Sequence, residues 1–462
     1  MNDSWAEAWK IYNEQVEKRT YEAASETVSG ILTEARVAND MATATRALVE
    51  LVQVRLALHG PERAVTLLAE EPWPDHPLAD HILPLMRAEA LGQYLGRYAW
   101  EIRQRDEMAD PGSDLSKWTA QQLRSEVQAI YAGLWAERES WGTKGLGPLG
   151  PYIFQNNYPP RIRSTLRDTI TYLWLGQLEN RSWWKPEHDQ EIFRLDLDEL
   201  LAEAEPAANG SGPAEDVHPL IRIRRLLTDL EAWHRDGDRP EAAFEARCRL
   251  IETLARSFTR VDENARLRAD LERGLDTLGS QYPWWSMGMA ELAELWNRLD
   301  IDEVPDARIH AREAARAGAR RHPESFGGKT SRHIAEQIEA PRYTLQAMAI
   351  DGSERRSIRL THKNLERIWL RAYPVDVEAR LRLGRSPMPY RAEEVRNARR
   401  REPVATWQVD LPTTGDYRSH HTDVVPPLGP GAYMVTASAR GDFAAEDNSR
   451  VTVGIQIGDP VP

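Results

Sequence analysis

The stretch "RHIAEQIEAPRYTLQAMAI" (residues 332–350) decides how the chain divides, because its residue pattern changes at Pro341. The residues before Pro341 predict a helix. From Arg342 onward the sequence breaks into short runs rich in Val, Ile, Thr and aromatic residues, punctuated by Gly, Pro and Asp, and such runs predict strands. We therefore expect a mainly α chain with a C-terminal β region.

Upstream of this stretch, the chain predicts short helices joined by short breaks. The segment "SWAEAWKIYNEQVEKR" places Trp5, Trp9, Tyr12 and Val16 at helical spacing. A succession of such helices is typical of stacked antiparallel hairpins, although we find no strict repeat period. The segment "AEAEPAANGSGPAEDVH" (202–218) predicts a linker. We expect a TPR-like helical-repeat region over 1–201 and a second helical region over 219–340.

About seven strands are predicted in the roughly 120 residues after Pro341, which indicates an antiparallel β-sandwich over 341–460. They fall in "RYTLQAMAI", "RSIRLTHKN", "LERIWLRAYPVD", "VATWQVDL", "YRSHHTDVVPPL", "GAYMVTASAR" and "SRVTVGIQIG". The charged run "RAEEVRNARRRE" (391–402) interrupts them. We favour an exposed loop or short helix of mixed charge there over a site for phosphate or an acidic partner.

Composition excludes several classes of protein. The net charge of -13 argues against a general nucleic-acid binder, which needs a basic face. A single cysteine, Cys248, cannot form an intramolecular disulfide, and its helical context predicts a small buried residue. No apolar run reaches the length of a membrane span. The start "MNDSWAEAWK" has no signal peptide, and the ending "GDPVP" is typical of an interdomain linker, so we expect further protein beyond it.

The stretch "HPESFGGKTS" (322–331) ends like a phosphate-binding loop, with Gly328-Lys329-Thr330. Such a loop needs a first glycine where this chain has Pro323, and a buried strand before it, where this chain has a charged helix. We therefore predict a helix stop at Pro323 and the glycines, with Thr330 or Ser331 capping the next helix.

Metal and catalytic patterns are weak, and we assign no catalytic, cofactor-binding or metal-ligating residue. His420 and His421 are adjacent, so a strand would point them to opposite faces. For His76 and His81, which have Asp75 and Asp80 nearby, we favour exposed or hydrogen-bonded side chains over metal ligands. The chain has no Gly-x-Ser-x-Gly motif. Its carboxylates stand beside arginines, as in "DENARLRADLERGLD" (262–276), which predicts a solvated, ion-paired helix face.

Sixteen tryptophans include two adjacent pairs, Trp183-Trp184 and Trp284-Trp285. Such pairs serve as platforms for carbohydrate or peptide, but we favour core packing between helices. An enzyme that cleaves glycans through these pairs would need two opposed carboxylates about 5–10 Å apart, and we rank that class of function low.

Three stretches resemble the N-terminal part of large bacterial alpha-2-macroglobulin-like proteins. Residues 5–49, "WAEAWKIYNEQVEKRTYEAASETVSGILTEARVANDMATATRALV", resemble the opening helical segment of that family. Residues 322–376, which include "HKNLERIWLRAY", resemble its step from helices into the first macroglobulin-like sandwich. Residues 428–439, "LGPGAYMVTASA", resemble its Leu-Pro-x-Gly-x-Tyr turn, although Gly429 stands where the family has proline.

The resemblance implies an exported protein of the bacterial envelope that takes part in protease defence. Family members trap proteases through a bait region, and some bind them through a thioester formed by Cys-x-Glu-Gln. This chain lacks that motif, since Arg249, Leu250 and Ile251 follow Cys248, and no bait region is evident. No active residue can be carried over.

We therefore expect a non-enzymatic scaffold or interaction module at the N-terminal end of such a protein. Its partners would be proteases or other domains of the same polypeptide, with no nucleic acid and no cofactor. The alternative is a stand-alone helical-repeat protein-binding module with an appended sandwich.

Overall fold

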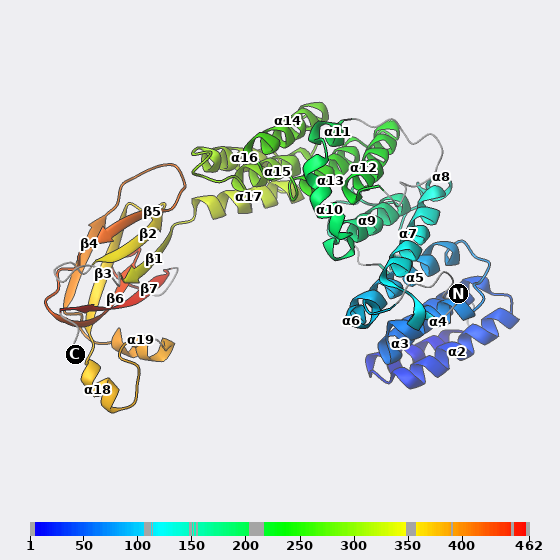
Figure 1. The fold of residues 1–462 in the computed structure, drawn as a ribbon, viewed down its shortest axis with the longest axis horizontal. Coiled ribbons are helices and arrows are strands. Elements are labelled where there is room, and N and C mark those ends of the chain that lie inside the picture. Colours follow the sequence, from blue (N-terminus) through cyan, green and yellow to red (C-terminus); the bar gives the residue numbers. More distant parts are fainter. Residues whose placement is uncertain are drawn as a thin grey trace. The chain divides into compact units, whose positions relative to one another are not determined.

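The computed structural model describes residues 5–105, 112, 114–146, 150, 152–153, 156–202, 217–347, 357–389, 391–444 and 448–458. The chain forms two compact units, Met1–Gly279 and Ser280–Pro462. The first is helical, and the second combines helices with antiparallel sheets (Figure 1). The expected mainly α chain with a C-terminal antiparallel β region is therefore confirmed.

Helices of the first unit run largely back and forth, each against its predecessor (Figure 1). The longer ones are α1 (Ala6–Glu17), α2 (Tyr21–Val37), α3 (Met41–His59), α4 (Pro61–Glu70), α5 (Ala79–Arg97), α7 (Ala120–Ala136), α9 (Leu166–Glu179), α12 (Pro219–Asp236), α13 (Pro240–Leu254) and α14 (Val261–Leu278). Short helical segments are α6 (Ala99–Ile102), η2 (Leu115–Lys117), α8 (Arg138–Trp141), η3 (Arg181–Trp183), α10 (Pro186–Glu191), η4 (Ile192–Arg194) and α11 (Leu197–Leu201).

One type of turn recurs between consecutive helices of this unit. Arg19, Asn39 and Asp238 each adopt a positive φ, of 58°, 56° and 54°. The next residue then donates its N–H to a carbonyl five residues back, as from Asp40 to Ala35. This is the Schellman ending of a helix, in which glycine usually takes the left-handed position. Because so short a turn reverses the chain, it produces the antiparallel hairpins that the sequence predicts.

The two helical regions that we expected over 1–201 and 219–340 do not coincide with the compact units, which divide after Gly279. Helix α9 packs against α12, and buried hydrogen bonds join them, such as that between Asp168 and His234. Helices on both sides of the predicted linker therefore share one unit. Residues 203–216 of that linker lie outside the described residues.

In the second unit, α15 (Trp285–Asn297), α16 (Ala307–Arg321) and α17 (Phe326–Glu339) pack against one another. The segment "HPESFGGKTS" forms the α16–α17 turn and the first turns of α17. Its cap differs from our expectation of Thr330 or Ser331: the hydroxyl of Ser325 accepts the N–H of Gly328, and α17 begins at Phe326. Both glycines lie inside the helix, where a Cβ at Gly327 would overlap the backbone of α15 and a Cβ at Gly328 would overlap that of the α16–α17 turn.

Seven strands are found among the described residues of the second unit, in the seven stretches that the sequence predicts. Their order is β1-β2-β5 in one sheet and β4-β3-β6-β7 in the other, and every pairing is antiparallel. The strands are β1 (Arg342–Ala347), β2 (Ile358–Lys363), β3 (Arg367–Pro374), β4 (Ala405–Asp410), β5 (His420–Val424), β6 (Gly431–Ser438) and β7 (Arg450–Ile457).

An apolar cluster of described residues lies between these sheets. Leu360 of β2 and Val424 of β5 come from one sheet, and Leu370 of β3 and Val435 of β6 from the other. The two sheets thus form a sandwich. Between β3 and β4 lie two short helices, α18 (Val377–Arg382) and α19 (Ala392–Ala398). Helix α19 occupies the charged run 391–402, where we expected an exposed loop or a short helix.

Candidate functional site

A groove of about 640 Å³ opens in the first unit between the segment before α5, α5 itself and α7. It is lined by Trp73, Pro77, Asp80, His81, Pro84, Ala129, Ile130, Gly133, Leu134, Glu137, Ser140 and Lys144. Its size lies within the range of pockets that hold a ligand or a few side chains of a partner.

Trp73 supplies a fixed aromatic surface at this groove. Its side chain is 37% exposed, so the ring is accessible from the groove that it lines. The indole N–H donates to the carbonyl of Leu68, at the end of α4, over 2.9 Å. Because that bond holds the ring, a partner that packs on it would cost little side-chain entropy.

Two features of the helices shape the other walls. Pro84 lies inside α5, and because proline has no N–H it leaves the carbonyl of Asp80 without its usual α-helical donor. On α7, the exposed residues Ala129 and Gly133 lie four apart, and a Cβ added to Gly133 would meet nothing within 4 Å. The groove therefore has a shallow wall of small residues on α7 and a proline-containing helix, α5, on another side.

Charge in the groove is carried by Asp80, Glu137 and Lys144, with His81 among them. Burial lowers the pKa of His81 below its ordinary value, and Lys144 lowers it further, while Asp80 and Glu137 oppose the shift. His81 is therefore neutral at pH 7, and two carboxylates face one ammonium group. This balance favours a partner that brings a basic group.

From the sequence, Asp80 and His81 were considered only as possible metal ligands, together with Asp75 and His76. In the structure, Nδ1 of His76 accepts the N–H of Leu78 at 3.2 Å in a local turn, and the groove is lined by Asp80 and His81 but by neither Asp75 nor His76. No cluster of three or more metal-ligating side chains occurs within the described part of the chain. The groove residues Trp73, Gly133, Glu137 and Lys144 were missed. The one available signal was a tryptophan between prolines in "EPWPDHP".

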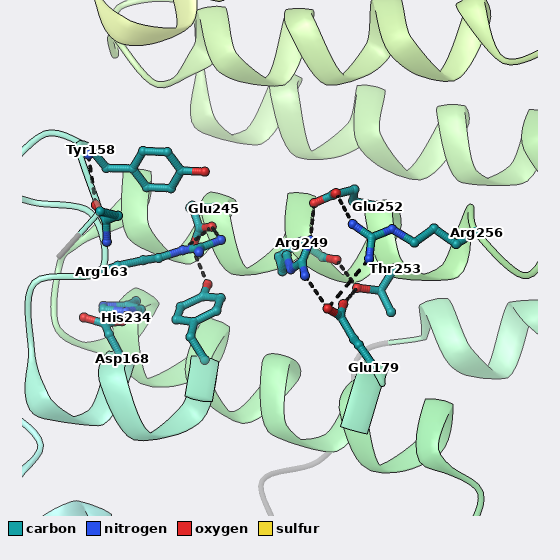
Figure 2. Close-up of polar contacts among 12 residues, drawn as sticks. Tyr158, Arg163, Asp168, Glu179, His234, Glu245, Arg249, Glu252, Thr253 and Arg256 are labelled. Atoms are coloured by element: carbon teal, nitrogen blue, oxygen red, sulfur yellow. Dashed lines mark hydrogen bonds and ion pairs between the residues drawn. The ribbon is translucent and has the colours of Figure 1, made fainter. Parts of the chain in front are cut away.

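Elsewhere in the first unit, a buried polar seam joins α9, α12 and α13 (Figure 2). Arg163 donates from Nε and Nη2 to Oε1 of Glu245, over 2.9 and 2.6 Å, and the hydroxyl of Tyr172 donates to the other carboxylate oxygen. Glu245 is only 5% exposed. The guanidinium also lies 3.8 Å from the centre of the Tyr172 ring. These bonds fix the irregular segment that ends at Arg163 onto α13.

A second part of the seam caps α9. Asp168 accepts from the N–H and hydroxyl of Thr165 and lies 2.7 Å from Nε2 of His234. Burial alone would raise the pKa of Asp168, but the bonds from His234 and Thr165 outweigh it, so the pKa falls below its ordinary value. Both side chains are buried. The Asp-His pair therefore closes a helix end inside the core, where a substrate has no access.

A third part lies further along α13, again with its carboxylates occupied (Figure 2). Glu179 is bound by Arg249 and by the hydroxyl of Thr253, and Glu252 is bound by Arg249 and Arg256. Such crossed pairs hold helices together and offer no carboxyl group poised for proton transfer.

The expected solvated face over 262–276 is only partly correct. Arg266 and Asp262 do form an exposed pair four residues apart. Asp270, however, is 3% exposed and receives two bonds from Arg247 of α13, over 2.7 and 2.6 Å. Packing of α13 on α14 covers that face, and the sequence pattern of one helix does not reveal its neighbour.

The other residues considered from the sequence do not line the α5–α7 groove. Of the two tryptophan pairs, Trp184 and Trp284 are buried, whereas Trp183 and Trp285 are half-buried, so the expected core packing holds for one member of each pair. The indole N–H of Trp184 donates to the carbonyl of Leu178. Cys248 is buried too. On β5, His420 contacts Asp416, whereas His421 contacts Thr361 of β2, so the two rings face opposite ways, as expected.

Comparison with known proteins gives no family: no protein-family model matches the chain, and no curated protein is similar to it at a significant level. Among the described residues, no helix has both the length and the apolar character that a membrane crossing requires.

Proposed function

We propose that this chain is a non-catalytic protein-binding scaffold whose α5–α7 groove takes an extended peptide segment of a partner protein. The observation that carries the proposal is the groove itself: an open surface with a fixed Trp73, a wall at Gly133 and an excess of carboxylate over ammonium. A peptide with an apolar side chain for Trp73 and a basic side chain between Asp80 and Glu137 fits this surface. The pairing of the buried carboxylates with arginine supports a structural role for them.

We further propose, from the resemblance, that the scaffold is the N-terminal module of an alpha-2-macroglobulin-like protein exported to the bacterial envelope. The order of helices followed by a seven-stranded sandwich supports this assignment. The partner would then be a protease or another domain of the same polypeptide. The alternative remains a stand-alone binding module, and it uses the same groove.

Peptide selection tests the groove. A displayed peptide library is selected on the full chain, and the enriched peptides are measured by calorimetry against Gly133→Arg, which fills the groove. We expect at least about a tenfold loss of affinity, because an arginine there replaces open space with a large side chain. The matched control is Gly30→Arg, on the exposed face of α2, where a Cβ also meets nothing within 4 Å. Equal affinity for both variants would reject the groove as the binding surface.

The coding DNA on either side of this reading frame separates the two forms of the proposal. Further sandwich domains with a bait segment or a Cys-x-Glu-Gln motif would support the alpha-2-macroglobulin-like assignment. Stop codons close to both ends would reject it and favour the stand-alone module.

A further inference from the structure

A second, smaller pocket of about 50 Å³ lies in the first unit, where α7, the end of α9, the Trp183–His188 segment and the start of α12 meet. No residue lines both this pocket and the α5–α7 groove. Three glutamines and the side chains of Trp183 and Leu178 contribute to its walls. Its most distinctive feature is charge.

Cations line this pocket without any carboxylate among its described lining residues. They are Arg124, Lys185 and Arg222, with His188 beside them. The nearby acids Glu187, Asp189 and Glu191 are on α10 and do not line it, and Glu179 is bound by Arg249 and Thr253. In a chain of net charge -13, such a concentration of positive charge is a local exception.

Two of these cations are held in place by neutral groups. Arg222 is 5% exposed and donates to Oε1 of Gln128 over 2.7 Å. Arg124 donates to the carbonyl of Ser182 over 3.2 Å, and its buried Nε has no hydrogen-bond partner among the described residues. Burial lowers the pKa of Arg124, which reflects the free-energy cost of placing its charge there. A bound anion would offset that cost.

The volume decides which anion fits. A water-sized atom needs roughly 10–15 Å³ of such space, so the pocket takes about three to five non-hydrogen atoms. A sugar ring is too large, which argues against the carbohydrate reading of Trp183-Trp184. A carboxylate with its adjoining methylene group has four such atoms. Its oxygens match the arginine and glutamine donors, and its carbon matches Trp183 and Leu178.

We propose that this pocket binds a carboxylate group, carried either by a small organic acid or by an Asp or Glu side chain of a peptide. Arg124 and Lys185 supply the charge, and Gln128 positions Arg222. The inference rests on the pocket alone and does not depend on the function proposed for the α5–α7 groove.

Thermal unfolding of the full chain tests this proposal. Sodium acetate is compared with sodium chloride at equal ionic strength. We expect acetate to raise the Tm saturably, by roughly 3 °C at ten times its Kd. Arg124→Gln and Lys185→Gln should each abolish the rise that is specific to acetate. Arg63→Gln, an exposed arginine of α4 outside the pocket, should retain it. Lys185 is exposed, so its variant should fold and keep the Tm of the parent in chloride.

A second arm identifies the carrier of the carboxylate. A capped Ala-Glu-Ala peptide is titrated in the same way, with Ala-Gln-Ala as its control. Tighter binding of the glutamate peptide than of acetate assigns the site to a peptide side chain, and equal binding assigns it to small acids. The proposal is overturned if acetate acts no differently from chloride, if both pocket variants keep the acetate response, or if inorganic phosphate raises the Tm while acetate does not.

Discussion

Several buried charged residues of this protein link neighbouring segments of the helical unit. Glu245 illustrates this, since it takes three hydrogen bonds from Arg163 and Tyr172 in a buried position. An ion pair of this kind adds little net stability over an apolar contact, but removal of one partner leaves a charge buried and unpaired.

We therefore predict that Glu245→Ala lowers the free energy of unfolding by about 3–5 kcal/mol. Tyr172→Phe removes one bond from the same carboxylate and should cost about 1–3 kcal/mol. Urea denaturation followed by circular dichroism measures both. Glu26→Ala, an exposed carboxylate on α2, is the control and should stay within about 0.5 kcal/mol of the parent. A cost for Glu245→Ala as small as that of the control would show that the seam is not structural.

His218 caps α12 in a way that depends on its protonation. Its Nδ1 accepts the N–H of Leu220 at 3.0 Å, and its Nε2 lies 3.1 Å from the carbonyl of His188, so the neutral ring donates there. Burial lowers the pKa of His218 below its ordinary value of 6.5, and the bond to the His188 carbonyl opposes that shift. A proton on Nδ1 would face the Leu220 N–H and remove the cap.

Stability should accordingly fall as the pH decreases from about 7 to 5. The unfolded chain takes up the His218 proton near its ordinary pKa while the folded chain does not, so the stabilisation present above pH 6.5 is lost below it. His218→Asn keeps a side-chain acceptor at the N-cap without a titrating group. Its unfolding free energy, measured in urea across this range, should change less than that of the parent. An identical pH profile for both proteins would contradict this assignment.

At the scale of elements, close approach of backbones determines the α15–α17 packing. Gly327 lies in the first turn of α17, and a Cβ there would overlap the backbone of Met287 on α15. The glycines of "HPESFGGKTS" are thus explained by helix contact, and the same residues that resemble a phosphate-binding loop serve to bring two helices together.

Gly327→Ala should destabilise the second unit by about 1–3 kcal/mol, because the helices must separate to admit the methyl group. The same substitution at Gly30, in α2, should stabilise the first unit by about 0.5–1 kcal/mol, because alanine is the better helix former and nothing lies within 4 Å. Thermal unfolding of each variant distinguishes the two signs. A stabilising Gly327→Ala would refute the close contact.

Across the whole molecule, each compact unit has its own apolar core: helix contacts in Met1–Gly279, and the sandwich cluster with the α15–α17 helices in Ser280–Pro462. Units built in this way fold independently as a rule. We predict that residues 1–279 and 280–462, expressed separately, each unfold in a single transition. Calorimetry should place each Tm within a few degrees of one transition of the full chain. A fragment that lacks a cooperative transition would show that its core is incomplete.

The sequence by itself determined the classes and order of elements: helices to Pro341, then seven strands. For the charged run 391–402, where α19 lies, it left a loop or a short helix open. These follow from local periodicity and from punctuation by Gly and Pro, which act within a few residues. It also argued against a phosphate-binding loop at 322–331, since Pro323 stands where the required glycine would be.

Only the tertiary structure decided which residues meet. At the helix endings of Arg19, Asn39 and Asp238, a residue other than glycine takes the left-handed position, so no glycine marked these turns. Asp270 is buried because α13 covers it. The first compact unit continues past the predicted linker, because α9 and α12, on either side of that linker, pack together. The groove at Trp73 and the cationic pocket at Arg124 each combine segments far apart in sequence. A local sequence pattern does not predict these tertiary contacts, because they depend on how the faces of separate helices pack.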